Sequence, residues 1–340
     1  MDVLIVGGTR FVGYQLAWRL LAGGHRVTLL NRGTRPDPFG DRVGRIVADR
    51  ATPEFARALA GRRFDAAVDF AAYTGDDARG AVEALGAARV GHYILISTGQ
   101  VYLVRADCPR PAREVDYDGP VLAEPADAAD LADWTYGIEK RRAEDVLAGA
   151  WSTAGFPSTR LRLPMVNGER DHYRRVEGYL YRLLDGGPVI LPDGGGHATR
   201  HVYAGAVVRA IGAMLGDAST FGRAYNLAQD ETPTLAELVA MLADLVGAPA
   251  RTVAVPSAAI RDAGLEPAAI SPFSGRWMSF LDPSIARDEL GFRHEAPRAY
   301  LDKVVAVFLN APPPAPPESY ARRADEIRLA DRYSSISRGG

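Results

Sequence analysis

The sequence predicts an α/β protein with a doubly wound, largely parallel central sheet and a smaller, mixed α/β second lobe. In the first half, short apolar runs rich in Val, Ile and Leu alternate with amphipathic stretches, which indicates buried parallel strands joined by helices. The first run leads into GGTRFVG, residues 7–13, a segment typical of a strand-to-helix turn. Beyond about residue 165 this alternation weakens, which indicates that a second lobe follows.

The expected elements of the first half follow from these two patterns. The apolar runs are short, as strands buried on both faces should be, and they lie at residues 3–6, 26–30, 44–48, 66–70, 93–97 and 159–163. The amphipathic stretches predict helices at residues 12–23, 53–59, 76–88 and 135–150. Because strands that alternate with helices need right-handed crossovers, the sheet should be parallel.

The second half is expected to build the smaller lobe and to return once to the sheet. Its expected elements are helices at 174–184, 204–215, 235–246 and 299–308 and a strand at 252–255. Thr234 precedes the third of these helices and is a candidate N-cap. The prolines of 311–317 indicate an extended spacer, and a loosely held terminus is favoured over a charged helix for the tail beyond it. The expected domains are therefore 1–165, 166–310 and a linker with tail at 311–340.

The composition excludes several classes of protein. The 340 residues are 47% hydrophobic and 24% charged, with a formal net charge of −2; a nucleic-acid binder usually shows a basic excess. Cys108 is the only cysteine, and the six histidines lack ligand spacing, so we expect neither a disulfide nor a metal site. The first strand begins near residue 2 and no apolar run reaches membrane-spanning length, so we expect a cytoplasmic protein that does not contact a membrane.

The first turn predicts a dinucleotide site. Gly7 permits a tight turn and Gly13 close packing of helix on sheet, and the unpaired N–H groups at the helix start attract a pyrophosphate. Arg10 stands where the usual spacing places a glycine. The second strand ends in Asn31 and Arg32, where sites that prefer NAD carry Asp or Glu. Two arginines suit a 2′-phosphate, so NADP(H) is favoured and NAD(H) is the second choice, although Arg10 could also simply point to solvent.

Two later strand ends continue this site. Asp49 follows the third strand and could accept a hydrogen bond from the adenine amino group, or it could cap a turn. Phe70, Ala71 and Ala72 follow the fourth strand, where small residues would leave room for the cofactor.

The residues expected to carry the chemistry lie further along the chain. Tyr136 and Lys140 are four residues apart at a helix start, so they share one face. The Lys140 ammonium would favour the tyrosinate and lower the Tyr136 pKa, which makes the phenol a useful acid and base. Thr98, at the end of a strand, can hydrogen-bond the same substrate oxygen. Such a set suits hydride transfer with a nicotinamide, whereas the competing interpretation is an exposed Tyr and Lys on an ordinary helix.

With these motifs the chain resembles an extended short-chain dehydrogenase/reductase of the NAD-dependent epimerase/dehydratase type, over residues 2–308. The segments GGTRFVG and LLNRG are similar to those of the atypical branch of this family that includes chloroplast stem-loop-binding proteins. The resemblance implies a Rossmann fold, a substrate-binding second lobe and a homodimer. It implies Tyr136 as catalytic acid and base, Lys140 as its pKa tuner and ribose ligand, and Thr98 as third member. Further cofactor contacts are expected at Thr9, Phe11, Val12, Ser97, Pro164 and Val166.

The chain departs from the family pattern where the substrate binds. Gly99 and Gln100 follow Thr98 in place of the Asp-Glu pair of sugar-nucleotide dehydratases, which argues against dehydration. His197 stands where such enzymes grip a diphosphate with arginine, and Ala204 replaces the usual Asp. We therefore expect a small-molecule substrate that is less charged than a sugar nucleotide, unless Arg200 compensates. The candidate substrate contacts are Gln100, Asn167, His172 and Arg200.

Three functions follow from these observations. The first is an NADP(H)-dependent reductase or dehydrogenase that acts on a small carbonyl or alcohol. The second is an epimerase of a sugar or nucleotide sugar that recycles its cofactor, so net NADPH consumption separates the two. The third is a cofactor-binding regulator or RNA-binding scaffold, which salt-dependent RNA binding would reveal.

Overall fold

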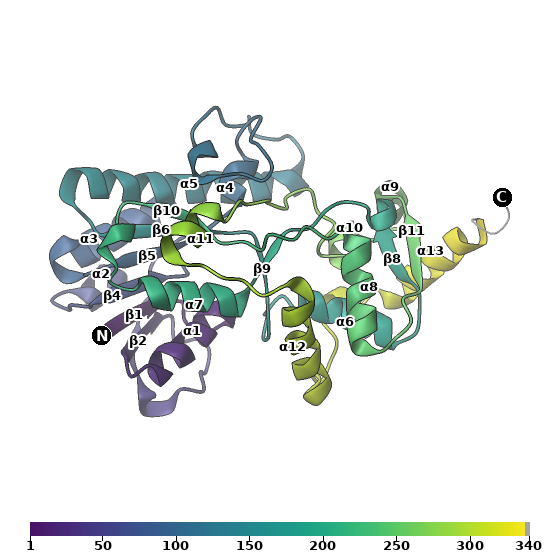
Figure 1. Ribbon diagram of the computed structural model, residues 1–340, viewed down its shortest axis with the longest axis horizontal. Coiled ribbons are helices and arrows are strands. Elements are labelled where there is room, and N and C mark those ends of the chain that lie inside the picture. The colour runs from purple at the N-terminus through teal and green to yellow at the C-terminus, as the bar shows by residue number, and fades with distance from the viewer. Residues whose placement is uncertain (337–340) are drawn as a thin grey trace. The chain divides into compact units, whose positions relative to one another are not determined.

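The structure is a computed structural model that describes residues 1–336, and it divides into two compact units (Figure 1). Unit 1 contains Met1–Val166, Ala204–Ala228 and Ser279–His294. Unit 2 contains Asn167–Tyr203, Gln229–Met278 and the chain from Glu295 onward. Two segments beyond residue 166 thus return to unit 1.

A seven-stranded parallel sheet forms the centre of unit 1, in the order β10-β6-β5-β4-β1-β2-β3. Val3 of β1 pairs with Val27 of β2 on one side and with Ala66 of β4 on the other, so β1 is central and buried. The doubly wound parallel sheet expected from the sequence is confirmed. Its strands are β1 (Asp2–Val6), β2 (Arg26–Asn31), β3 (Val43–Val47), β4 (Ala66–Asp69), β5 (Tyr93–Thr98), β6 (Ser158–Leu163) and β10 (Ala224–Asn226).

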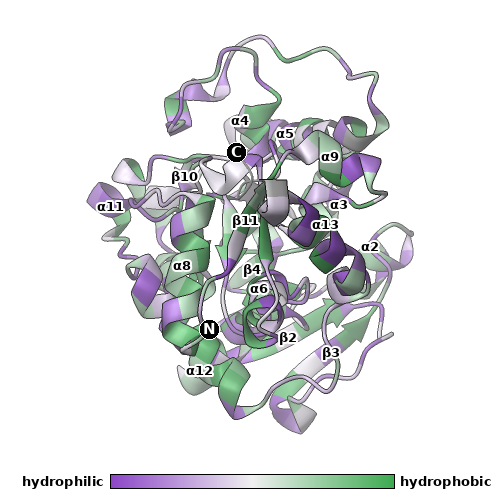
Figure 2. Cartoon of the chain, turned by 90° about the vertical axis from the view of Figure 1, so that its right-hand side faces the viewer, coloured by the Kyte–Doolittle hydropathy of each residue, from purple (hydrophilic) through white to green (hydrophobic). Residues whose placement is uncertain are grey.

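Helices cover both faces of this sheet (Figure 1). One face carries α2 (Glu54–Leu59), α3 (Gly75–Arg89) and α5 (Ala128–Ala154), and the other carries α1 (Phe11–Ala22) and α7 (Ala204–Met214). The short helices α4 (Gln100–Leu103) and α11 (Ser284–Leu290) complete unit 1. Figure 2 shows the strands mostly in the colour of hydrophobic residues, as expected for a sheet covered on both faces.

Unit 2 contains a two-stranded parallel sheet and several helices. In the sheet, β8 (Val189–Pro192) pairs with β11 (Thr252–Val255). Thr234 caps α8, as the sequence predicted, and the structure shows that it forms a capping box with Glu237. The remaining elements before the tail are β9 (His201–Tyr203), α6 (Arg175–Leu184), α8 (Leu235–Val246), α9 (Ser257–Asp262), α10 (Pro267–Ile270) and α12 (Pro297–Asn310). β7 (Met165–Asn167) lies at the change from unit 1 to unit 2.

The expectation of a loosely held tail is wrong. α13 (Arg323–Ile336) packs Leu329 and Ala330 into a hydrophobic cluster with β8 and β11 residues. Its Glu326 forms an ion pair with Arg182 of α6 at 2.6 Å, and both side chains are 1% exposed. Before α13, the Tyr181 hydroxyl donates to the Pro313 carbonyl of the proline segment at 3.0 Å, and the Ala315 carbonyl lies 3.4 Å from the same hydroxyl. The tail is therefore a part of the core of unit 2.

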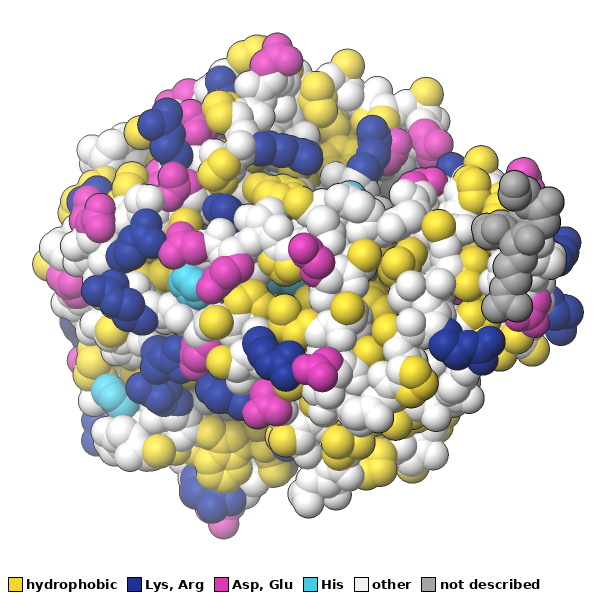
Figure 3. Space-filling view, turned by 45° about the vertical axis from the view of Figure 1, so that its right-hand side comes forward, with side chains coloured by type: hydrophobic (Ala, Val, Ile, Leu, Met, Phe, Trp, Pro, Cys, Tyr) yellow, Lys and Arg dark blue, Asp and Glu magenta, His cyan; other side chains and the backbone are white. Residues whose placement is uncertain are grey.

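The surface carries mixed charge. On the face drawn in Figure 3, basic and acidic side chains are interspersed rather than gathered into a basic stripe. No helix within residues 1–336 is long and apolar enough to cross a membrane.

Candidate cofactor site and active site

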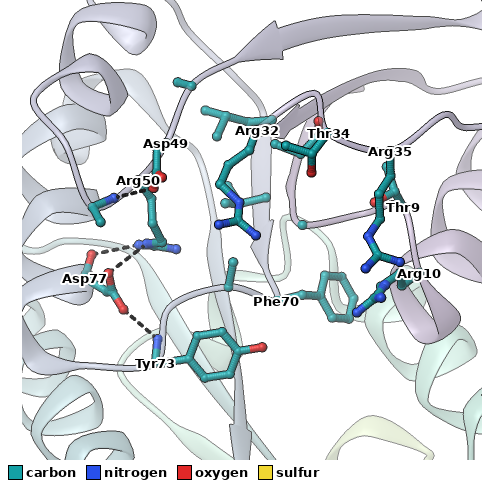
Figure 4. Close-up of a pocket in the computed structure, with 17 residues that line it drawn as sticks. Thr9, Arg10, Arg32, Thr34, Arg35, Asp49, Arg50, Phe70, Tyr73 and Asp77 are labelled. Atoms are coloured by element: carbon teal, nitrogen blue, oxygen red, sulfur yellow. Dashed lines mark hydrogen bonds and ion pairs between the residues drawn. The ribbon is translucent and has the colours of Figure 1, made fainter. Parts of the chain in front are cut away.

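A pocket of about 500 Å³ lies in unit 1 at the carboxyl ends of β1, β2, β3 and β4 (Figure 4). In a doubly wound sheet, ligands bind beyond the carboxyl ends of the strands. Eight of the residues expected to bind a cofactor line this pocket: Gly7, Thr9, Arg10, Asn31, Arg32, Asp49, Phe70 and Ala71.

The turn from β1 into α1 explains its glycines and tolerates Arg10. Gly7 has a φ of +84°, which favours glycine. A Cβ on Gly13 would lie 2.9 Å from the Gly8 Cα, so a side chain there would push α1 away from the turn. Arg10 has φ −132° and ψ 150°, an extended conformation that any residue adopts. The backbone therefore does not require glycine at position 10, and an arginine side chain can be placed there.

Besides Arg50, three arginines line the pocket. Arg10 comes from the β1–α1 turn, and Arg32 and Arg35 follow β2. Figure 4 shows the Arg10 and Arg35 guanidinium groups next to each other and Arg32 pointing into the pocket. Among the described residues, none of the three forms an ion pair with a carboxylate. Like charges held together repel, so this end of the pocket favours an anion.

The sequence reasoning missed Arg35. The chain reverses after β2 because the Asn31 Oδ1 accepts a hydrogen bond from the Gly33 N–H at 2.8 Å, and Gly33 has a φ of +67°. This reversal returns residue 35 to the pocket. The Asn-x-Gly pattern at a strand end was the available signal.

Two charged residues after β3 also line the pocket, next to Ala48 and Ala51. The Asp49 Oδ1 accepts a hydrogen bond from the Ala51 N–H at 3.0 Å, so this carboxylate shapes its own turn while it borders the pocket. Arg50, which the sequence reasoning did not single out, borders the pocket and pairs with Asp69 and Asp77.

The expected catalytic residues lie in unit 1, on β5 and α5. Lys140 is 2% exposed, and its Nζ donates to the carbonyls of Ala72 at 2.7 Å and Ile96 at 2.8 Å. Burial lowers the Lys140 pKa to about 8, and the carboxylates of Asp69 and Glu144 oppose that shift. Thr98 ends β5 and is half-buried. Tyr136 is half-buried one turn before Lys140 on α5.

Tyr73 connects the pocket with these residues. It lines the pocket, and its ring centroid lies 4.9 Å from the Lys140 Nζ and 6.3 Å from the Tyr136 ring centroid. A cation beside an aromatic face is stabilised by the ring quadrupole. The pocket and the Tyr136–Lys140 pair are therefore neighbouring parts of one site.

Several expected cofactor residues do not line this pocket. The Ser97 Oγ donates to Glu144 at 2.5 Å, and Glu144 is buried against Arg162. Val166 is half-buried. Apart from Tyr136 and Lys140, the others are buried: Phe11, Val12, Gly13, Ala72 and Pro164.

The expected substrate residues are divided between the units. Gln100, in unit 1, donates from its Nε2 to Asp133 at 2.9 Å. Asn167 is buried in unit 2 with its Nδ2 2.8 Å from the His201 Nδ1. Arg200 donates to Thr232 and to the Asp230 carbonyl, and His172 is exposed beside Tyr173. Within residues 1–336, no group of three or more His, Cys, Asp or Glu side chains is placed to hold a metal ion.

Comparison with known proteins finds a relative of similar sequence in a plant chloroplast protein. The chain is 24% identical over 261 residues to the chloroplast stem-loop binding protein of 41 kDa b of Arabidopsis thaliana. That match covers 73% of this chain and 64% of the relative, so it spans less than two thirds of the relative's length.

Three of the solved structures that share this fold are an epimerase, a UDP-glucose 4-epimerase and a dTDP-glucose 4,6-dehydratase. An epimerase from Methanothermobacter thermautotrophicus has a TM-score of 0.73 at 17% identity, covering 91% of this chain and 92% of its own. A UDP-glucose 4-epimerase from Thermotoga maritima, with UDP-glucose, has a TM-score of 0.71 at 20% identity, covering 91% and 99%. The dTDP-glucose 4,6-dehydratase DesIV from Streptomyces venezuelae, with NAD and TYD bound, has a TM-score of 0.70 at 21% identity, covering 92% and 98%.

The family assignment rests on the model that describes the NAD dependent epimerase/dehydratase family, which matches residues 3–228. This range includes every strand of the seven-stranded sheet except the first residue of β1. It also includes the pocket, Thr98, Tyr136 and Lys140. The chain therefore belongs to the NAD dependent epimerase/dehydratase family.

Proposed function

We propose that this protein binds NADP(H) in preference to NAD(H) and uses it to transfer hydride to or from a small-molecule carbonyl or alcohol. The observation that carries this proposal is the set Arg10, Arg32 and Arg35, whose guanidinium groups border the pocket without carboxylate partners in the described chain. Arg32 follows Asn31, at the strand end where a carboxylate would select the 2′-hydroxyl of NAD. Charge-assisted hydrogen bonds from these groups suit a 2′-phosphate.

The bound nicotinamide would supply or accept the hydride, and this chain's residues would handle the proton. Tyr136 and Thr98 would bind the substrate oxygen, with Tyr136 giving or taking its proton. The ammonium of Lys140 uses two of its three donors on carbonyls. The third remains for the Tyr136 phenolate or for a ribose hydroxyl, and the positive charge favours that phenolate.

An epimerase is the second candidate, since the family includes epimerases and the same residues could oxidise and then reduce one alcohol. Stoichiometry distinguishes the two: a reductase consumes one NADPH per product, whereas an epimerase recycles it. The residues that follow Thr98, Gly99 and Gln100, carry no carboxyl group, so water elimination is not part of the proposal.

The cofactor proposal is tested by fluorescence titration with NADPH and NADH. We expect the double variant Arg10→Ala/Arg32→Ala to lose about 10- to 100-fold in NADPH affinity, because a hydrogen bond to a charged group contributes about 1.5–3 kcal/mol. NADH affinity should change little. Arg42→Ala is the control, since Arg42 lies outside the pocket with its guanidinium over the Trp18 ring. Equal affinity of the wild type for both cofactors would contradict the proposal.

We further propose a cytoplasmic homodimer that does not bind RNA. The stem-loop binding relative makes RNA a specific alternative, but a net charge of −2 gives little attraction to phosphates. Salt-dependent retention of RNA in a filter assay, together with failure to bind either cofactor, would favour the scaffold function.

A further inference from the structure

The turn between β4 and α3 separates the cofactor pocket from the catalytic lysine. We call residues 70–74 the FAAYT turn. Phe70, Ala71 and Tyr73 of this turn line the pocket, and the Ala72 carbonyl accepts a hydrogen bond from the Lys140 Nζ at 2.7 Å. The position of the FAAYT turn therefore determines both the pocket wall and one contact of the lysine.

Two carboxylates hold the backbone of the FAAYT turn. The Asp69 Oδ1 accepts from the Ala71 N–H at 2.8 Å. The Asp77 Oδ2 accepts from the N–H groups of Tyr73 at 2.8 Å and Thr74 at 3.0 Å. The turn is thus fixed near its beginning by β4 and at its end by α3.

Arg50 binds both carboxylates at once. Its Nη1 lies 2.8 Å from both Asp69 oxygens, and its Nε donates to the Asp77 Oδ1 at 3.1 Å. Its Nη2 donates to the Asp77 carbonyl at 2.8 Å. The guanidinium carbon lies 5.1 Å from the centroid of the buried Phe55 ring, and the Arg50 side chain is 11% exposed where it borders the pocket. The guanidinium is therefore held by hydrogen bonds and by packing.

We propose that Arg50 is a positioning residue for Lys140, which clamps the FAAYT turn through Asp69 and Asp77 so that the Ala72 carbonyl and the pocket wall stay in place. The proposal rests on the proposed function, because it assigns Arg50 a role in the same site. The positive charge of Arg50 also offsets the carboxylate of Asp77, which borders the pocket, and that of Asp69, which is buried.

The Lys140 pKa can be measured to test whether Arg50 acts on Lys140. Lys140 is surrounded by Asp69 on β4, Asp77 on α3, Glu144 on α5 and Arg50 after β3; the three carboxylates raise its pKa and Arg50 lowers it. Tyr73 and Tyr136 are the aromatic groups nearby. Removal of Arg50 leaves Asp69 and Asp77 without their cation, so the Lys140 pKa should rise from about 8.

The chain is suited to this measurement because Lys140 and Lys303 are its only lysines. Lysine labelled with ¹³C at Cε therefore gives two NMR signals, and Lys303, which is half exposed, serves as an internal reference. We expect Arg50→Met to raise the Lys140 midpoint by about one pH unit and to weaken NADPH binding by about tenfold or more. Arg50→Lys keeps the positive charge but cannot hydrogen-bond to Asp69 and Asp77 at the same time. Its Lys140 midpoint and its NADPH affinity should therefore lie between those of Arg50→Met and the wild type.

Arg45→Met is the matched control. Arg45 lies on β3 and donates from its Nε and Nη2 to the single carboxylate of Asp37, outside the pocket, so neither the Lys140 midpoint nor NADPH affinity should change. An unchanged Lys140 midpoint in Arg50→Met would overturn the proposal, even if NADPH affinity falls. If Arg50→Met does not fold, Arg50→Lys provides the same comparison, and Asp77→Asn, which removes a carboxylate that raises the Lys140 pKa, should lower the Lys140 midpoint. Failure of the wild type to bind either cofactor would refute the proposed function instead, while the NMR midpoint would still test the Arg50 link.

Discussion

Lys140 is a buried ammonium whose pKa, about 8, lies in the range where cells and assays operate. It is charged below this pH and neutral above it, and only the charged form attracts the cofactor and favours the tyrosinate. We expect NADPH affinity to fall by up to about tenfold as pH rises from 7 to 9.5. A tenfold fall corresponds to a Lys140 pKa that is about one unit higher in the NADPH complex than in the free protein. Titrations across this range in wild type and in Lys140→Met test the prediction.

The Lys140→Met variant provides the control because it has no charge to lose. Its NADPH affinity should be lower at pH 7 and nearly independent of pH. A similar decline in both proteins would assign the titration to another group.

At the residue scale, spacing and strand ends placed Arg10, Arg32 and Asp49 at the pocket. Arg35 and Arg50 escaped that reasoning because a loop reversal and two tertiary ion pairs bring them there. One signal in the sequence was overlooked. The chain has 40 basic Lys and Arg residues, of which only Lys140 and Lys303 are lysines. A lysine kept at position 140 in so arginine-rich a chain indicates chemistry that a guanidinium cannot perform.

At the element scale, the start of α1 depends on a close approach of backbone to backbone. A Cβ at Gly13 would lie 2.9 Å from the Gly8 Cα and 3.3 Å from the Gly7 carbonyl oxygen. Backbone atoms cannot rotate away as a side chain does, so α1 would have to shift. We expect Gly13→Ala to lower the free energy of unfolding by about 1–3 kcal/mol and to weaken NADPH binding, as urea unfolding and fluorescence titration would show.

Gly80→Ala is the appropriate comparison. Gly80 lies within α3, and a Cβ there would meet no atom within 4 Å. Alanine should stabilise this helix by about 0.5–1 kcal/mol. Loss of stability in both variants would mean that the contact with Gly8 is not the cause.

Elements with a strong periodic pattern were predicted well, and the others depended on tertiary contacts. The helix at 235–246 was expected at the bounds that α8 has, because its apolar stripe and Thr234 cap are local. α5 begins at Ala128, seven residues before the expected start at 135. The sequence did not favour the formation of α13, because the helix is mostly polar and the few residues that it buries give no clear apolar pattern. Figure 2 shows it mostly in the hydrophilic colour.

At the scale of the whole molecule, the chain alternates between two units rather than completing one before the other. Ala204–Ala228 returns to unit 1, where α7 packs against α1 and β10 extends the sheet beside β6. Ser279–His294 returns a second time, and its Glu289 forms an ion pair with Arg223. The sequence predicted a single return to the sheet, because the helix of the second return, α11, has only seven residues and is too short for a clear periodic pattern.

The last helix makes unit 2 dependent on the end of the chain. Arg182 on α6 is 1% exposed, and Glu326 on α13 supplies both carboxylate oxygens to it. Removing one partner of a buried pair leaves an uncompensated charge, which costs about 3–5 kcal/mol, whereas replacing both with apolar groups is often neutral. We therefore expect Glu326→Gln to destabilise unit 2 strongly and Arg182→Met/Glu326→Leu to recover part of the loss, because Arg323 also pairs with Glu326 at 3.2 Å and would keep only Asp185 as an ion-pair partner. Hydrogen–deuterium exchange should show faster exchange in peptides of unit 2 than in those of unit 1. Asp244→Asn is the control, because it breaks an exposed pair with Arg298 in the same unit and should change the free energy of unfolding by at most about 1 kcal/mol. An equal effect of Glu326→Gln and Asp244→Asn would show that burial of the Arg182–Glu326 pair does not determine how α13 is held.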